Sequence, residues 1–384
     1  MARTLRAFEI LQKINRVVSE KVVAVWNTRR ISVPEGHDIL EIGYCRFFHE
    51  LLPRRTTYVA VGASPQDEAR ADLVLGPRTL AAFRRLVGHP AFKVVMCRIS
   101  SARPSAWSWV VQALCGPADF AALGQRSWSL RPQTGRQTRQ APLIVVDFED
   151  EATIHLSDLP LLHACRLYFK RELPVDRWRL LIGALQGRES HTAVRANPRY
   201  LALIAKLHPL SLGLPLVETR HSIPLHEIRK TIDLFVAGSV DTRSWVRRVG
   251  MVELEALRAD GISVEINVDP LAPAAFYRQC AQAYITWSPE GFGWDCWRHY
   301  EAAACRSVPL INYPPTERHA PLRQGEHALF YDPSPGGLTR AVLAALADKP
   351  KLLQMAGVAR AHVLAHHTPE AIAEMMVSRA TAAE

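Results

Sequence analysis

Short apolar segments alternate with helical segments through the second half of the chain, and this alternation most constrains the fold. A helix between two strands carries the chain back across a sheet, so that the second strand runs parallel to the first. The pattern therefore predicts an α/β fold with a largely parallel sheet. The predicted strands are 233–237, 263–268, 283–287 and 308–312, and the predicted helices are 243–258, 276–282, 297–305, 338–347, 351–366 and 369–380.

The first half shows the same alternation. At 384 residues the chain is too long for one ordinary hydrophobic core, and two domains are expected. Prolines and glycines at 209–224 predict the boundary, which gives an N-terminal domain at 1–215 and a C-terminal domain at 216–368. Residues 369–384 are expected to cross back onto the first domain. The predicted strands here are 22–26, 58–61, 72–75, 92–96 and 143–148, with a helix at 78–87 and an exposed basic loop at 124–142.

Charge and composition restrict the classes of partner that the chain can bind. The formal charge of +10 favours anionic partners, but no helix-turn-helix, zinc-finger or RNP-like pattern predicts nucleic acid as one of them. Residues 1–26 form an amphipathic basic pattern, which predicts either a helix packed on the domain or one lying on an anionic membrane surface. Seven singly spaced cysteines predict reduced thiols without a disulfide framework or structural zinc site. We expect a cytoplasmic protein, because neither a signal peptide nor a membrane span is apparent.

The segment 288–305 carries the clearest chemical signal. It follows a predicted strand, contains Gly291 and Gly293, and opens a helix. Glycines allow the backbone to approach a ligand closely, and a helix N-terminus offers free N–H groups to a phosphate. Arg298 is suited to bind a diphosphate through two hydrogen bonds. Glu301 lies three residues later on the same face, where a carboxylate can accept both hydroxyls of a ribose.

This segment resembles the C-terminal domain of GT-B glycosyltransferases, in particular the group 1 glycosyl transferases with their CgeB-like branch. Their pattern is Glu-Gly-Phe-Gly followed by a glutamate that opens Glu-Ala-x-Ala-Cys-Gly, and Glu290 and Glu301 match its two glutamates. The resemblance continues through 325–332 to the C-terminal helices. It implies two Rossmann-like domains with parallel sheets facing a central cleft, a nucleotide-sugar donor in that cleft, and no metal or other cofactor.

The segment departs from this pattern in two ways, and the inserted residues 294–298 resemble a second group. Ten residues separate Glu290 from Glu301, more than in the common pattern, and Arg306 replaces the usual glycine. The exostosin-type motif Gly-x-Asp-x-x-Arg-x-Trp-Glu-Ala matches Asp295, Arg298, Glu301 and Ala302. Residues 167–172 also resemble that group. Group 1 enzymes typically retain the anomeric configuration whereas exostosin-type glucuronyl transfer inverts it, so both outcomes stay open.

Further candidates come from the loops after other strands. Gly238 and Ser239, followed by Arg243, Arg247 and Arg248, form a second candidate phosphate cradle. In the first domain Asp147, Glu149, Asp150 and His155 follow a strand and are candidates for the general base that an inverting transferase needs. Lys170 and Arg171 are candidates to neutralise the leaving diphosphate.

Each candidate also has a structural interpretation. Arg298 and Glu301 would form a solvated ion pair on a helix, and Asp295 would cap that helix. Glu290, the acidic loop at 147–155, and the basic side chains would be surface charges. Trp294 and Trp297 are more typical of a core than of a stacking platform, and His299 is expected to be structural.

The sequence as a whole predicts glycosyl transfer from a nucleotide sugar to a hydroxyl of a glycan or lipid-linked acceptor. Bacterial surface polysaccharide or lipopolysaccharide assembly, at the inner face of a membrane, is the expected setting. A non-catalytic sugar-nucleotide or glycan-binding protein and a GT-B nucleotide-sugar epimerase are the alternatives. No G-x-G-x-x-G with a following acidic residue supports a dehydrogenase.

Overall fold

The computed structural model describes residues 32–99, 106–115, 140–185, 195, 198–216, 222–224, 226–238 and 244–382. The predicted helix at 1–26, the strand at 22–26, most of the loop at 124–142, and the candidates Ser239 and Arg243 lie outside these residues. Within the described ranges, none of the helices has the length and apolar character needed to cross a membrane.

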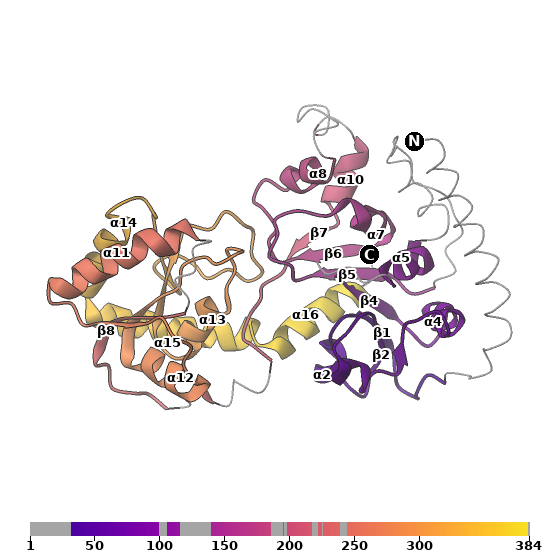
Figure 1. Cartoon of the computed structure of the whole chain (residues 1–384), viewed down its shortest axis with the longest axis horizontal. Coiled ribbons are helices and arrows are strands. Elements are labelled where there is room, and N and C mark those ends of the chain that lie inside the picture. The colour runs from indigo at the N-terminus through magenta and orange to yellow at the C-terminus, as the bar shows by residue number, and fades with distance from the viewer. Residues whose placement is uncertain are drawn as a thin grey trace.

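The first half forms a sheet of seven parallel strands in the order β3-β2-β1-β4-β5-β6-β7 (Figure 1). Every residue of β1, β2, β4 and β5 is buried, as expected for parallel strands that are covered on both faces. The elements are β1 (Ile39–Gly43), α2 (Phe48–Leu51), β2 (Thr56–Ala60), α3 (Pro65–Glu68), β3 (Leu73–Val74), α4 (Leu80–Val87), β4 (Val94–Arg98), α5 (Trp107–Cys115), β5 (Leu143–Asp147), η1 (Leu156–Asp158), α7 (Leu159–Ala164), β6 (Leu167–Lys170), α8 (Trp178–Leu185), α10 (Pro198–Ile204) and β7 (Leu207–Pro209).

The second half forms a sheet of five parallel strands in the order β12-β11-β10-β8-β9. Local signals begin its helices: the Ser244 side chain accepts the Arg247 N–H at 3.3 Å, and Pro273 opens the helix after β9. The predicted alternation is confirmed. The elements are β8 (Ile232–Ala237), α11 (Trp245–Ala259), β9 (Val264–Asn267), α12 (Pro273–Gln282), β10 (Ala283–Trp287), α13 (Trp297–Ala304), β11 (Val308–Asn312), β12 (Leu329–Tyr331), α14 (Gly337–Leu346), α15 (Lys349–His366) and α16 (Pro369–Thr381).

Each sheet has a hydrophobic core on both faces. Along β8, Leu234 joins one core and Phe235 joins the other, because successive strand residues point to opposite faces. In the first half, one face is covered in part by α16, where Met376 packs in the same core as Val94 and Phe169. The C-terminal helix therefore follows the second half in sequence but packs on the first sheet, as the yellow helix in Figure 1 shows.

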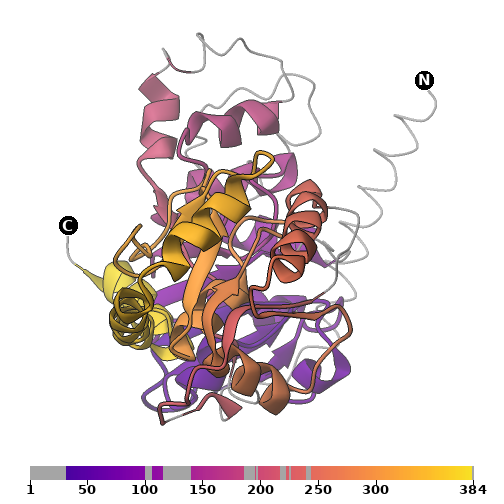
Figure 2. The same ribbon diagram turned by 90° about the vertical axis from the view of Figure 1, so that its left-hand side faces the viewer.

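The two chain segments that connect the halves contact each other. The Leu214 N–H donates a hydrogen bond of 2.8 Å to the carbonyl of His367, between α15 and α16. Gly213 has a φ of +68°, and a side chain there would collide with His367 and Ile372. The two connecting segments are thus closely packed against each other where the chain passes between the halves. The view turned by 90° shows one half in front of the other (Figure 2).

Candidate functional site

The loops after β8, β10 and β11 meet at the carboxyl-terminal edge of the second sheet. Gly238 follows β8, and residues 288–296 follow β10. The Glu290 N–H donates to Asn312 Oδ1 at 2.9 Å, and Asn312 Nδ2 donates to Glu290 Oε2 at 3.0 Å. The last residue of β11 therefore holds the loop. Ligands of open α/β sheets bind at this edge.

A buried histidine fixes the shape of the loop. Burial lowers the pKa of His299 to about 3, so its ring is neutral. Its Nε2 lies 2.8 Å from the Trp294 carbonyl, and its Nδ1 lies 2.6 Å from the Ser288 hydroxyl. Because a carbonyl only accepts, Nε2 donates and Nδ1 accepts from Ser288. Trp294 is buried and donates to the Asn312 carbonyl at 2.9 Å, so both residues have structural roles.

Arg298, in the first turn of α13, lies directly beneath the turn after β8. A Cβ on Gly238 would collide with Nη2 of Arg298, and Gly238 has a φ of +126° that side chains rarely allow. Within the described part of the chain, no hydrogen bond or ion pair is formed by the Arg298 guanidinium. Burial lowers its pKa first, and the charge of Arg247 lowers it further. A half-buried guanidinium beside a second cation is a ready site for an anion.

Arg247 brings the second positive charge to this loop from α11. Its Nε donates to the Glu290 carbonyl at 2.9 Å, and its Nη2 would lie 3.1 Å from a Cβ on Gly291. Gly291 in turn donates its N–H to the Gly293 carbonyl at 2.9 Å. The predicted glycine turn is therefore present, with Arg247 beside Gly291, and Arg298 lies beside Gly238 within electrostatic reach of Arg247.

Glu301 does not form the solvated ion pair with Arg298 that the structural interpretation suggested. Its Oε1 accepts the Tyr277 hydroxyl at 2.8 Å instead. Burial raises the pKa of Glu301, although Tyr277 and Arg298 oppose this shift. One carboxylate oxygen is thus fixed by Tyr277 while the side chain lies within the electrostatic reach of Arg298.

Asp295 holds the loop to the connection between the halves. It is 1% exposed, and its two oxygens accept the Tyr300 hydroxyl and the Leu212 N–H, each at 2.6 Å. It does not cap α13, whose N-cap is Cys296 without a side-chain bond. Burial and these contacts occupy its carboxylate, so a direct contact of Asp295 with the donor stays a prediction that the geometry does not favour.

Asp147 and Lys170 form a buried pair across neighbouring strands. Lys170 is 0% exposed, and its Nζ donates to Asp147 Oδ1 at 3.0 Å. Asp147 also accepts the Tyr168 hydroxyl at 2.9 Å and the Glu149 N–H at 3.0 Å. Each side chain is thus buried and occupied by the other in this structure. The catalytic role of Asp147 and the diphosphate contact of Lys170 stay predictions that this pairing does not favour.

The other candidates from the loop at 147–155 lie in different places. His155 lies 2.5 Å from Glu151 at the surface. Asp150 forms an ion pair of 2.6 Å with Arg171, and its carbonyl would lie 3.1 Å from a Cβ on Gly293. Arg171 also donates to the Asp295 carbonyl at 2.5 Å. Asp150 is therefore the predicted base nearest to the loop, and His155 is not brought together with it.

Glu172 is a residue of this region that the candidate set missed. It is 2% exposed, lies against Gly293, and accepts the Asp295 N–H at 2.9 Å. Burial raises its pKa to about 7, and the Asp295 N–H and the charge of Arg171 oppose this shift only in part. In the sequence, Glu172 was noted only as the last residue of the segment 167–172 that resembles the exostosin group. That resemblance did not assign a role to Glu172.

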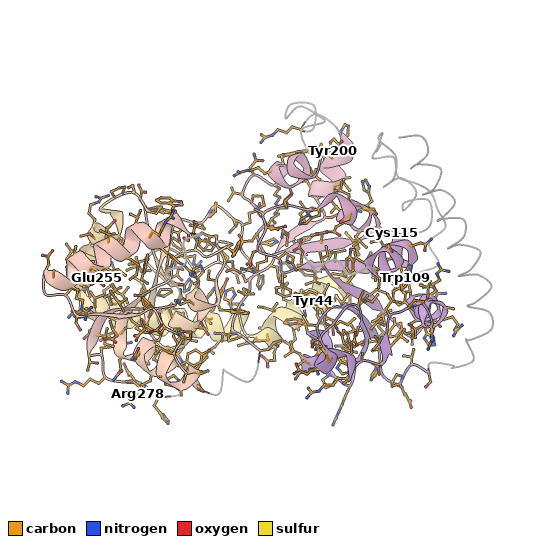
Figure 3. All side chains as sticks on the ribbon, viewed as in Figure 1. Tyr44, Trp109, Cys115, Tyr200, Glu255 and Arg278 are labelled. Atoms are coloured by element: carbon orange, nitrogen blue, oxygen red, sulfur yellow. The ribbon has the colours of Figure 1, made fainter. Side chains whose placement is uncertain are left out.

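The first half also presents polar side chains after its strands. Tyr44 follows β1, and burial raises its pKa to about 12; Figure 3 labels it between the two halves. The Arg98 guanidinium, at the end of β4, lies 5.5 Å from the Tyr44 ring centroid and 5.0 Å from that of Phe148. Among the described residues no group of three or more His, Cys, Asp or Glu is placed to hold a metal.

Comparison with known proteins agrees with this architecture. Residues 227–378 match a family model described as "Glycosyl transferase-like". A glycosyltransferase from Rickettsia africae ESF-5 superposes with a TM-score of 0.53 at 10% identity, covering 90% of this chain and 98% of that one. The chain has the GT-B fold. An alpha-glucosyltransferase solved with UDP and a 13-mer DNA superposes with a TM-score of 0.50 at 8% identity, covering 90% of this chain and 100% of that one.

These matches confirm the predicted GT-B fold and a glycosyl transferase-like domain in the second half of the chain. A search of curated protein sequences gave no significant match. The CgeB-like branch and the exostosin-like motif stay predictions. The matched segment contains α11, the loop at 288–296 and α13, so that Arg247 and Arg298 both lie within it.

Proposed function

We propose that the chain transfers a glycosyl group from a nucleoside-diphosphate sugar to an acceptor hydroxyl. The observation that carries this proposal is the pair of arginines at the carboxyl-terminal edge of the second sheet, Arg298 beside Gly238 and Arg247 beside Gly291. Two guanidiniums within electrostatic reach of each other, one of them without an ionic partner among the described residues, match the charge of a diphosphate. They would stabilise the leaving nucleoside diphosphate as its charge develops.

The other residues take roles around that centre. Glu301, oriented by Tyr277, would accept the ribose hydroxyls, and Glu290 would face the donor sugar from the loop. Asp150 would be the base for an inverting reaction, because its backbone lies against Gly293 of the loop and its carboxylate is exposed. Arg247 and Arg298 would supply the positive charge that a divalent metal supplies elsewhere, so we expect chelators to leave activity unchanged.

The donor is the first part of the proposal to test. Since one structure of this fold was solved with UDP, UDP-sugars are the first candidates, followed by GDP-, CMP- and dTDP-sugars. Ligands that bind the folded state raise its melting temperature. We expect one donor class to do so with the unaltered chain and not with Arg298→Ala. No shift with any donor, or an equal shift in both proteins, would contradict the proposal.

Transfer is tested separately from binding. Release of the nucleoside diphosphate should require an added acceptor, because domain closure excludes water from the donor. A glycan or lipid-linked hydroxyl of bacterial surface polysaccharide assembly, used by the protein in the cytoplasm or at the membrane's inner face, is the acceptor class we propose. An altered free sugar nucleotide without acceptor would instead identify an epimerase, and donor binding without turnover a binding protein.

A further inference from the structure

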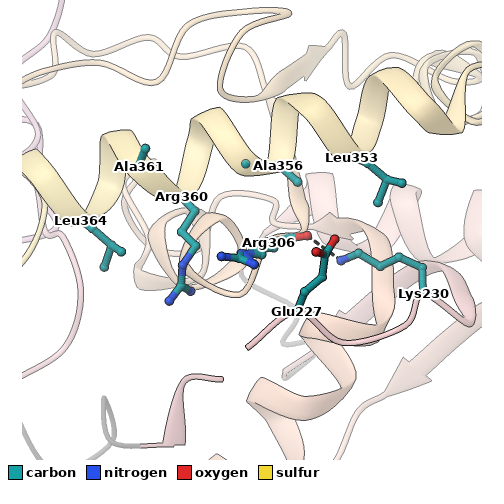
Figure 4. A pocket seen from close by; sticks show the side chains of 9 residues that line it. Glu227, Lys230, Arg306, Leu353, Ala356, Arg360, Ala361 and Leu364 are labelled. Atoms are coloured by element: carbon teal, nitrogen blue, oxygen red, sulfur yellow. Dashed lines mark hydrogen bonds between the residues drawn. The ribbon is translucent and has the colours of Figure 1, made fainter. Parts of the chain in front are cut away.

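A second basic site lies at the opposite edge of the second sheet. A cavity of about 370 Å³ is lined by residues before β8 and β11 and by one face of α15 (Figure 4). Lys230 precedes β8, and its ammonium group contacts the carbonyls of Ala281 at the end of α12 and of Ala283 at the start of β10. This is the amino-terminal edge of the sheet, whereas Arg298 and the loop 288–296 lie at the carboxyl-terminal edge.

Lys230 supplies charge at the back of the cavity without free donors. Its Nζ donates to the carbonyls of Ala281, Ala283 and Arg306 at 2.9, 2.7 and 2.5 Å. An ammonium group has three donors, so all are in use. Burial lowers the pKa of Lys230 to about 8. It therefore positions the backbone and adds positive potential, but it does not itself reach a ligand.

Arg306 and Arg360 bring two guanidiniums to the same cavity. Burial lowers the pKa of Arg360, and the charge of Arg306 lowers it further, so the two cations act on each other. Arg360 also donates to the carbonyl of Ala304 near the end of α13. Within the ranges that the structure describes, no carboxylate forms an ion pair with either arginine. Among the residues that line the cavity, Glu227 is the one acidic residue, and it is exposed.

Arg306 occupies a backbone conformation that suits glycine. Its φ of +58° places it in the left-handed region, which costs a side-chain-bearing residue free energy. Arg360 and Lys230 bond backbone carbonyls, as basic residues near a helix end often do. No hydrogen bond of this kind, to any described residue, occupies the guanidinium of Arg306. The Arg306 guanidinium is therefore available to bind an anion in the cavity.

Apart from Arg360, the residues that α15 contributes to the cavity are apolar. Leu353 and Leu364 are 41% and 43% exposed, and the small residues Ala356, Gly357 and Ala361 lie between them in sequence. Figure 4 shows the two leucines at opposite ends of the cavity, with Arg306 and Arg360 between them. We propose that this cavity binds a phosphate group carried on a molecule with an apolar stem, as in a lipid headgroup or a free phosphate ester.

Arg306→Gly tests this site, because glycine accepts the left-handed backbone while the guanidinium is removed. Arg278→Ala is the matched control, since Arg278 is an exposed arginine on α12 at the outer side of the molecule (Figure 3). Melting temperatures are measured with inorganic phosphate and glycerol phosphate against chloride at equal ionic strength. Phosphate bound at Arg298 affects all three proteins equally, so differences between them report the second site.

If a free phosphate ester is the ligand, Arg306→Gly binds phosphate about tenfold more weakly than the unaltered chain and Arg278→Ala. If a lipid headgroup is the ligand, free phosphate has little effect. Vesicles of phosphatidylcholine with phosphatidylglycerol then retain the unaltered chain and Arg278→Ala but not Arg306→Gly, and vesicles of phosphatidylcholine alone retain none. Equal behaviour of all three proteins in both assays overturns the proposal, whatever the outcome of the donor screen.

Discussion

Glu172, after β6 of the first half, accepts a hydrogen bond of 2.9 Å from the backbone N–H of Asp295 in the loop of the second half. Glu172 also lies against Gly293, and the side chain of Asp295 holds the connection between the halves through Leu212. The Glu172 carboxyl group thus joins the first half to the loop at 288–296, and the Asp295 carboxyl group joins that loop to the segment that connects the halves.

This contact predicts a pH-dependent stability. The pKa of Glu172 is raised from 4.5 to about 7 by burial, so the folded state disfavours the ionised form. Its contribution to the free energy of unfolding is fully present below pH 4.5 and is lost as the pH rises through about 7. In Glu172→Gln this loss is absent. The melting temperature of the unaltered chain relative to Glu172→Gln should therefore fall between these pH values, and a constant difference would contradict the assignment.

Arg247 and its neighbour Arg248 give a matched pair for the donor site. Arg247 bonds the Glu290 carbonyl and lies beside Gly291, whereas Arg248 is exposed on the same helix. Loss of a charged hydrogen bond costs about 1.5–3 kcal/mol, so Arg247→Ala should weaken donor binding about tenfold to a hundredfold. Arg248→Ala should leave it unchanged in isothermal titration. Equal effects of both changes would indicate a general charge effect only.

Gly238 allows a test of the position of Arg298 without changing the arginine. Gly238→Ala would strain the backbone and push the guanidinium aside, since a Cβ there meets Nη2. Gly261→Ala imposes comparable strain at a φ of +91° with no atom within 4 Å of the new Cβ. Both should lower stability by about 1 kcal/mol or more. We expect only Gly238→Ala to lose donor affinity, and a similar loss in Gly261→Ala would refute this role.

The elements of the second half could be predicted because their signals are local. The strands 283–287 and 308–312 are continuous apolar runs, and the structure has them with the same bounds. β1 was missed because Glu41 interrupts its apolar pattern. That glutamate is fully buried, and its carboxylate accepts backbone N–H groups of Phe47, Phe48 and His49. A compensating contact of this kind depends on the tertiary fold.

The same reasoning explains which site residues could be predicted. Arg298, Glu301 and the glycine turn belong to one contiguous segment, so their spacing carries the information. Glu172 reaches that segment from the other half of the chain, and nothing in its neighbours specifies this contact. The pairing of Asp147 with Lys170 could not be predicted for a related reason. Pairing of β5 with β6 sets the two opposite each other, and the register of a pair of strands is not visible in either strand alone.

The buried pair gives a final prediction that separates stability from binding. Lys170→Ala leaves the Asp147 carboxylate buried without its ionic partner, which typically costs about 3–5 kcal/mol of folding free energy. Because Lys170 is fully enclosed, the folded fraction should bind the donor with an unchanged Kd. Denaturant unfolding would measure the first quantity, and titration calorimetry below the unfolding transition the second. A Kd weakened tenfold in the folded protein would restore Lys170 to the donor site, and unchanged stability would contradict the buried pair.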